Sequence, residues 1–180
     1  MIFLDSITDE YSSRTHVWSN GYVPFEFSNI DMSVEDDIRV SRMFIVIRGE
    51  NSVIKLVADR SSGALVRGEC VLISRFHKAP HESSSPMFGR PVIDAARHSS
   101  HSDHLVKAET TIFVGQNFLE LIWFQGRAMD MSVQDGAVIY YVDETRRLFG
   151  LRVVDVDEEV MREAKELIWK SNRQAPSATI

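Results

Sequence analysis

The chain has 180 residues, a hydrophobic content of 44% and a formal net charge of −6. This length fits one domain with a sizeable core, and the acidic balance argues against a nucleic-acid-binding protein, which normally presents a basic face. The single cysteine, Cys70, excludes an internal disulfide and favours a reducing compartment.

The amino-terminal apolar run, residues 1–4, is too short for a secretory signal, because Asp5 interrupts it. No apolar stretch approaches the roughly 20 residues that a membrane-spanning helix requires. We therefore expect a cytoplasmic protein with no membrane partner.

The first forty residues predict only short elements. Residues 6–10 could begin a short helix, and residues 22–27 have the aromatic content of a strand. Pro24 has no backbone N–H to donate, so this strand is expected at a sheet edge. Residues 33–36 resemble a capping box and predict one helical turn.

Alternating apolar and polar residues then predict three strands joined by hairpin turns. They cover residues 43–47, 52–58 and 64–73. A glycine inside a strand often marks a bulge, so Gly68 predicts a bulge or bend in the third strand.

Residues 77–104 break this pattern. They contain five of the six histidines, six serines and three prolines. Only residues 91–97 look helical, with Pro91 at the helix start. We expect the stretch to be one long loop, and loops of this length are usually functional or disordered.

Strands return over residues 106–114, 118–124, 137–142 and 148–154. The strand at 118–124 is apolar on both faces except for Glu120, which predicts a central strand covered on both sides. A buried carboxylate at Glu120 could act as a general base with a raised pKa, but pairing with lysine or arginine is the commoner role.

Residues 157–172 predict an amphipathic helix, with acidic residues at its start and basic residues towards its end, as the helix dipole favours. Its apolar stripe consists of Val160, Met161, Ala164, Leu167 and Ile168. Residues 174–180 are expected to form a frayed tail.

These elements predict a single α+β domain over residues 1–180. We expect a largely antiparallel β-sheet of about seven or eight strands, with the carboxyl-terminal helix packed on one face. Two predicted hairpins share an aspartate at the start of the turn, Asp59 and Asp143. Either both turns need the same chemistry, or the hairpins are copies of one β unit.

Residues 98–104 resemble the His-x-His-x-Asp-His motif of metallo-β-lactamase-like hydrolases. His101, Asp103 and His104 match its last three positions, but Ser99 stands where the first histidine is required. That family also needs further histidine ligands downstream, and no histidine follows His104.

A looser metal site could involve Asp94 and His98, which would share one face of a helix at a spacing of four residues. Two ligands do not make a site, so we predict no metal and no cofactor. A small metal-dependent hydrolase that uses the histidines of residues 77–104 remains the alternative.

Other enzyme signatures are missing from the sequence, including the Gly-x-Ser-x-Gly elbow, phosphate-binding glycine loops and Cys-x-x-Cys. We therefore expect no catalytic residues and a non-enzymatic binding protein. Cys70 is expected to be a small buried hydrophobe.

A small, acidic, single-cysteine chain without a catalytic motif resembles bacterial immunity proteins as a class. The resemblance implies a protein partner, a cognate toxin domain such as a nuclease, whose basic surface would complement the acidic chain. No nucleic acid is expected as a partner, and the oligomeric state stays open. A structural or assembly module that recruits partners through an exposed edge strand is a further alternative.

The expected contact surface contains the exposed acids Glu35, Asp36 and Asp37. Aromatic side chains nearby either act as its anchors or cover the core of the sheet. These aromatic residues are Trp18, Tyr22, Phe25 and Phe27.

Overall fold

The computed structural model describes residues 1–20, 23–29, 42–73, 75–76, 80, 85–94, 97 and 104–174. Within these residues, fifteen strands form two sheets, and the helix α2 (Glu158–Gln174) follows the last strand. The α+β class with mostly antiparallel sheets and a carboxyl-terminal helix is confirmed.

Nine strands form the first sheet: β1 (Ile2–Thr8), β7 (Arg75–Phe76), β8 (Met87–Phe88), β9 (Arg90–Ile93), β11 (Thr111–Val114), β12 (Leu119–Ile122), β13 (Met131–Asp135), β14 (Val138–Val142) and β15 (Arg147–Val153). Seven of them follow the order β7-β11-β12-β15-β14-β13-β8. The strand β1 pairs with the start of β15 and then with β9.

Six strands form the second sheet: β2 (His16–Asn20), β3 (Val23–Ser28), β4 (Arg42–Arg48), β5 (Ser52–Asp59), β6 (Leu65–Ile73) and β10 (His104–Lys107). Their order is β10-β4-β5-β6-β3-β2. All neighbours are antiparallel except β10, which runs parallel to β4.

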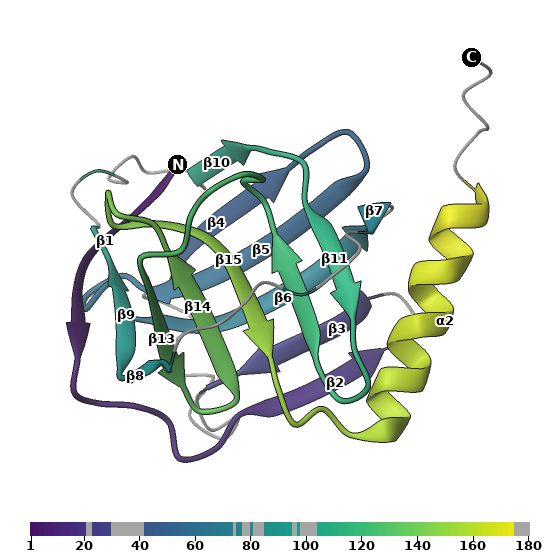
Figure 1. The fold of residues 1–180 in the computed structure, drawn as a ribbon, viewed down its shortest axis with the longest axis horizontal. Coiled ribbons are helices and arrows are strands. Elements are labelled where there is room, and N and C mark those ends of the chain that lie inside the picture. The colour runs from purple at the N-terminus through teal and green to yellow at the C-terminus, as the bar shows by residue number, and fades with distance from the viewer. Residues whose placement is uncertain are drawn as a thin grey trace.

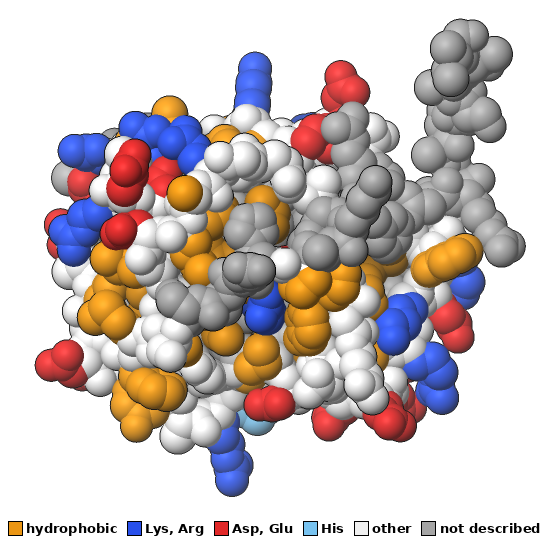
Figure 2. Space-filling view, viewed as in Figure 1, with side chains coloured by type: hydrophobic (Ala, Val, Ile, Leu, Met, Phe, Trp, Pro, Cys, Tyr) orange, Lys and Arg blue, Asp and Glu red, His pale blue; other side chains and the backbone are white. Residues whose placement is uncertain are grey.

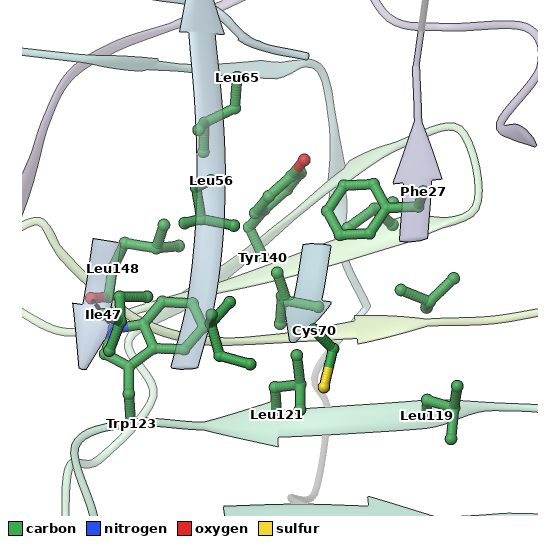
Figure 3. Close-up of a cluster of buried hydrophobic side chains, with 14 of the residues drawn as sticks. Phe27, Ile47, Leu56, Leu65, Cys70, Leu119, Leu121, Trp123, Tyr140 and Leu148 are labelled. Carbon is green, nitrogen blue, oxygen red and sulfur yellow. Dashed lines mark hydrogen bonds between the residues drawn. The ribbon is translucent and has the colours of Figure 1, made fainter. Parts of the chain in front are cut away.

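The two sheets face each other across one main hydrophobic core (Figure 1). Figure 3 shows Phe27 and Leu56 from the six-stranded sheet lying among Leu121, Trp123 and Tyr140 of the other side. All five side chains are buried. Burying a large apolar side chain contributes about 1.5–3 kcal/mol, so this shared interior is the main source of stability.

Separate elements close the two sides of this sandwich (Figure 1). On one side β1 and β9 pair, and an isolated bridge between Ala64 and Val92 ties β9 to the start of β6. On the other side α2 packs against β2, β3 and β6. The predicted stripe of α2 faces this contact, and its members Met161, Ala164 and Ile168 are buried.

Several predicted elements are confirmed, but their arrangement differs from expectation. Six predicted strands match β4, β5, β6, β12, β14 and β15, and the helix at 157–172 matches α2. The predicted ranges are 43–47, 52–58, 64–73, 118–124, 137–142 and 148–154. The sheet of seven or eight strands is instead two sheets of shorter strands. The strand β13 was not predicted, because its alternation spans only residues 131–134 and ends at the Asp135-Gly136 turn signal.

The single strand predicted at 106–114 is wrong, because β10 and β11 lie in different sheets. The chain crosses between them at Glu109. Its carboxylate accepts hydrogen bonds from the backbone N–H of Asn51 at 3.1 Å and from the Ser52 hydroxyl at 3.2 Å. The Thr110 N–H donates to the same Ser52 hydroxyl at 2.8 Å. The β4–β5 turn therefore holds the crossing point.

Both predicted short helices within the described residues are wrong. Residues 6–8 continue β1, and Pro91 lies in β9, opposite Ile7 of β1. Pairing between β1 and β9 satisfies backbone groups that a lone helical turn would leave open, so tertiary context overrides the local signal. The long loop expected over residues 77–104 likewise contains β8 and β9. The capping box at 33–36 and residues 175–180 of the tail lie outside the described residues.

Two special residues behave differently from expectation. The strand β3 lies between β6 and β2, not at an edge. It tolerates Pro24 because pairing with β6 starts only at Phe25 and pairing with β2 is irregular there. Gly68 lies in regular pairing, where a Cβ atom would be 2.3 Å from the ring of Phe27. A close approach, not a bulge, requires this glycine.

The two hairpin aspartates organise their turns in the same way. The Oδ1 atom of Asp59 accepts hydrogen bonds from the N–H groups of Ser61 at 3.1 Å and Ser62 at 2.7 Å. The Oδ1 atom of Asp143 accepts from Thr145 N–H at 2.9 Å and Arg147 N–H at 3.1 Å. These hydrogen bonds show that both turns use the same chemistry, as the first of the two predicted explanations requires.

We predict that Asp143→Asn reduces the acid sensitivity of the fold. Burial raises the pKa of Asp143, but hydrogen bonds from Thr145 and Arg147 and the charge of Arg127 outweigh it, so its folded pKa is lowered. A lowered folded pKa gives stability that is present above the unfolded pKa, about 3.9, and is lost as pH falls through the folded value.

Urea unfolding at a series of pH values from about 6 to 2 measures this effect. An asparagine still accepts the turn hydrogen bonds but does not titrate, so the free energy of unfolding of the variant should fall less steeply below pH 4. Equal slopes for the variant and the unaltered protein would show that this aspartate does not contribute to acid unfolding.

Candidate protein-binding surface

A buried polar network ties three distant parts of the chain to the end of β13. The carboxylate of Asp135 is 0% exposed. It accepts hydrogen bonds from Arg90 Nε at 2.8 Å, from Asn29 Nδ2 at 2.9 Å and from the backbone N–H of Ser12. Thr15 extends the network, since its hydroxyl donates to Asn29 Oδ1 and accepts from the N–H of Ala137, both at 2.8 Å.

This network fixes the segment between β1 and β2 against the β13–β14 turn. Gly136 in that turn has φ +61°, and a Cβ atom there would lie 2.2 Å from the Thr15 hydroxyl. Only glycine combines this backbone conformation with such a close approach. Hydrogen bonds through Ser12 and Thr15 therefore anchor this segment to the end of β13 and the turn that follows it.

Three large apolar side chains project from this anchored region. Tyr11, Met87 and Phe88, which we call the aromatic patch, are 57%, 55% and 66% exposed. The rings of Tyr11 and Phe88 lie 6.1 Å apart between centroids at an angle of 48°. Figure 2 shows hydrophobic side chains projecting at the lower left, where Figure 1 places β8.

An open recess of about 330 Å³ lies beside the aromatic patch. Tyr11 and Phe88 contribute to its wall, the Gly136–Ala137 turn and Asp155 also line it, and the remaining lining residues carry hydroxyl groups. These are Ser12, Ser13 and Thr15. The recess thus combines two aromatic rings, three hydroxyls and one carboxylate.

The surroundings of the aromatic patch are acidic. Asp9 and Glu10 directly precede Tyr11, and both are exposed, as is Asp155 in the recess. Arg14 is the exposed basic residue of the same segment, so these four side chains carry a net charge of −2. Exposed apolar groups rimmed by charge have the composition of a protein–protein contact.

The predicted contact residues are only partly placed. Glu35, Asp36 and Asp37 lie outside the described residues, as does Tyr22, so their role stays a prediction. Phe25 and Phe27 lie in the core and cannot anchor a partner. Trp18 is half-buried, with the guanidinium of Arg67 at 5.5 Å from its ring.

Sequence reasoning missed the aromatic patch because its members are far apart in the chain. Met87 and Phe88 stand between Pro86 and Gly89, and Tyr11 stands among polar residues. None of them belongs to a periodic pattern with a buried face. A large apolar residue outside any such pattern was the one signal in the sequence that could have indicated an exposed position.

Glu120 forms an ion pair with Arg152. Pairing with lysine or arginine was the commoner of the two roles predicted for it. Its carboxylate is 0% exposed and accepts hydrogen bonds from Arg152 Nη2 and the Tyr141 hydroxyl, both at 2.7 Å. The guanidinium of Arg152 also lies 4.9 Å from the ring of Phe118. Burial, followed by the hydrogen bond and the charge of Glu120, raises the pKa of Tyr141. The arrangement is that of a structural ion pair.

The described residues contain no group of three His, Cys, Asp or Glu side chains that could hold a metal ion. His104 lies on β10, and the other four histidines of residues 77–104 lie outside the described part. Pro91 lies in the strand β9, so the helix expected to pair Asp94 with His98 does not begin at Pro91. Asp94 follows this strand and forms a salt bridge with Arg97.

Cys70 is buried, as predicted, and burial raises the pKa of its thiol.

Comparisons with known proteins do not place the chain in a family. No protein-family model matches the sequence, and no curated protein matches it. Within the part of the chain that the structure covers, no helix has the length and apolar character needed to cross a membrane.

We predict that Glu120 and Arg152 are strongly coupled in stability. Removing one member of a buried ion pair leaves an uncompensated charge and costs about 3–5 kcal/mol. Glu120→Leu and Arg152→Met should each be strongly destabilising. The double variant should cost less than their sum, with a coupling energy of at least about 1 kcal/mol.

Urea unfolding of the four proteins measures this coupling. The exposed pair Glu159–Arg162 on α2, with an N–O distance of 3.6 Å, is the matched control. Its own double-mutant cycle should give less than about 0.5 kcal/mol, because water screens an exposed pair. Additive costs at Glu120 and Arg152 would contradict the prediction.

Proposed function

We propose that this chain is a non-enzymatic binding protein that uses the aromatic patch and its acidic rim to bind a basic protein partner. The observation that carries the proposal is the exposed Tyr11–Phe88 ring pair beside an acidic recess. Aromatic residues dominate the binding energy of protein interfaces, and scattered single exposed residues do not form such pairs.

The hydrogen bonds and strand pairing that anchor the region support this proposal. Binding costs free energy when surface segments must become ordered, so anchors on a fixed framework bind more tightly. Asp135, Asn29 and Thr15 hold the segment that carries Tyr11, and β8 pairs with β13 through Met87 and Phe88. Both halves of the aromatic patch therefore rest on β13.

The charge of the region supports a basic partner. Asp155 lines the recess, the exposed Asp9 and Glu10 directly precede Tyr11, and the whole chain carries a net charge of −6. Opposite charge on a partner speeds encounter and selects against acidic proteins. Together with the resemblance to immunity proteins, this favours a toxin domain with a basic cleft, such as a nuclease, bound in the cytoplasm.

Purification of the chain with the product of the adjacent open reading frame tests the proposal, together with protection of cells against that product. We expect a complex and protection. Phe88→Ala and Tyr11→Ala should each weaken binding by about 2 kcal/mol, or roughly 30-fold, measured by calorimetry. Because both side chains are largely exposed, the stability of the variants should change by less than about 0.5 kcal/mol.

Trp169 on α2 provides the matched control, because it is an exposed aromatic residue, 62% exposed, outside the aromatic patch. Trp169→Ala should leave the affinity unchanged. A second control is the triple variant Glu35→Gln/Asp36→Asn/Asp37→Asn. It measures the contribution of the acidic surface predicted from the sequence separately from that of the aromatic patch. The absence of both a complex and protection would refute the proposed function.

A further inference from the structure

We propose that the recess beside the aromatic patch binds an arginine side chain of the partner. This inference rests on the proposed function for the identity of the partner, but the site itself is defined by its own lining. The recess measures about 330 Å³, which is at the small end of the range for ligand pockets. It is therefore suited to one side chain, not to a large cofactor.

The two rings provide the first part of the recognition. A cation interacts with an aromatic face when it lies within about 6 Å of the ring centroid. The Tyr11 and Phe88 rings contact each other, with centroids 6.1 Å apart, and both residues line the recess, so a cation would sit in the recess beside the ring pair and not between the rings. A planar guanidinium stacks on aromatic rings and is more weakly hydrated than an ammonium group, which favours arginine over lysine.

Asp155 provides the counter-charge. Its side chain lines the recess and is exposed, and it forms no ion pair with any residue that the structure describes. A guanidinium that enters the recess can therefore form a new charge-assisted hydrogen bond with this carboxylate. The hydroxyl of Ser13, which also lines the recess, offers a further acceptor to the five N–H groups of arginine.

The backbone holds Asp155 in place before any partner binds. The N–H of Val154 donates to the carbonyl of Ala137 at 2.8 Å, and the N–H of Val156 donates to the carbonyl of Asn117 at 3.0 Å. Asp155 itself has φ +55°, a left-handed conformation that aspartate and asparagine tolerate better than most residues. The backbone of Asp155 is thus held next to Ala137, and the residue lines the recess from this position.

Arg14 does not line the recess, although it is close in sequence. Its exposed guanidinium adds positive charge to the same segment. If a bound arginine is held by local charge, Arg14→Ala should leave its affinity unchanged or raise it slightly.

The test is a titration of the ¹⁵N-labelled full chain, followed by NMR, with blocked tripeptides of sequence Gly-X-Gly. The arginine peptide is the probe, and the citrulline peptide is its neutral match in shape. We expect saturable shifts of the amide signals of Ser12, Gly136, Ala137 and Asp155 with arginine only. A lysine peptide should bind more weakly, because an ammonium group does not stack.

The variant Asp155→Asn should lower the affinity for the arginine peptide about fivefold or more, because it removes the charge and keeps the left-handed backbone. The control Asp130→Asn removes an exposed carboxylate at the other end of β13 and should have no effect. Equal binding of arginine and citrulline peptides, no saturable shifts, or an unchanged affinity in Asp155→Asn would overturn the inference.

The same variants separate this inference from the proposed function. A complex with the adjacent gene product whose affinity is unchanged by Asp155→Asn would refute the arginine site and support the proposed function. Specific binding of the arginine peptide without any complex or protection would support the site and refute the proposed function.

Discussion

The buried carboxylate of Asp135 is the interaction on which the arrangement of the molecular surface depends. A charge without exposure to water is tolerated only when partners replace the lost hydration. Here those partners are Arg90, Asn29 and Ser12, which come from three separate parts of the chain. The hydrogen bonds to this one carboxylate therefore bring together the segment before β2, the end of β3 and the start of β9. The aromatic patch and the recess lie directly on this junction.

The two sheets and α2 supply the framework that carries this junction. The core between the sheets is apolar, and β1–β9 and α2 close its two sides. Glu120 is the buried charge of the central strand β12, and Arg152 pairs with it. The hydrogen bonds from Arg152 and Tyr141 engage the Glu120 carboxylate within the fold, which gives it a structural role. The distinctive features of the described surface are therefore shape, exposed rings and charge.

Local patterns predicted the parts of the fold that depend on neighbours in sequence. The β4–β5–β6 hairpins followed from alternation, and the turn at Asp143 followed from the hydrogen bonds that an aspartate makes to the next few N–H groups. The predicted stripe of α2 was also right, because helical spacing alone decides which residues share a face. The strand expected at 106–114 and the helix expected at 91–97 failed for one shared reason. Partners distant in sequence, Ser52 and Ile7, decide where these segments lie.

By itself the sequence determined the class of the fold, the positions of seven of the fifteen described strands and the apolar face of the helix, and it favoured pairing of Glu120 with a basic residue over a catalytic role. These properties follow from the period of apolar residues and from the cost of burying an unpaired charge. Only the tertiary structure decided that the strands divide into two sheets and that Tyr11 meets Phe88. Residues 77 positions apart in the chain become neighbours only when a shared partner binds both segments, and here β13 is that partner. No local pattern encodes such a meeting, because its free energy comes from contacts that exist only after the chain has folded.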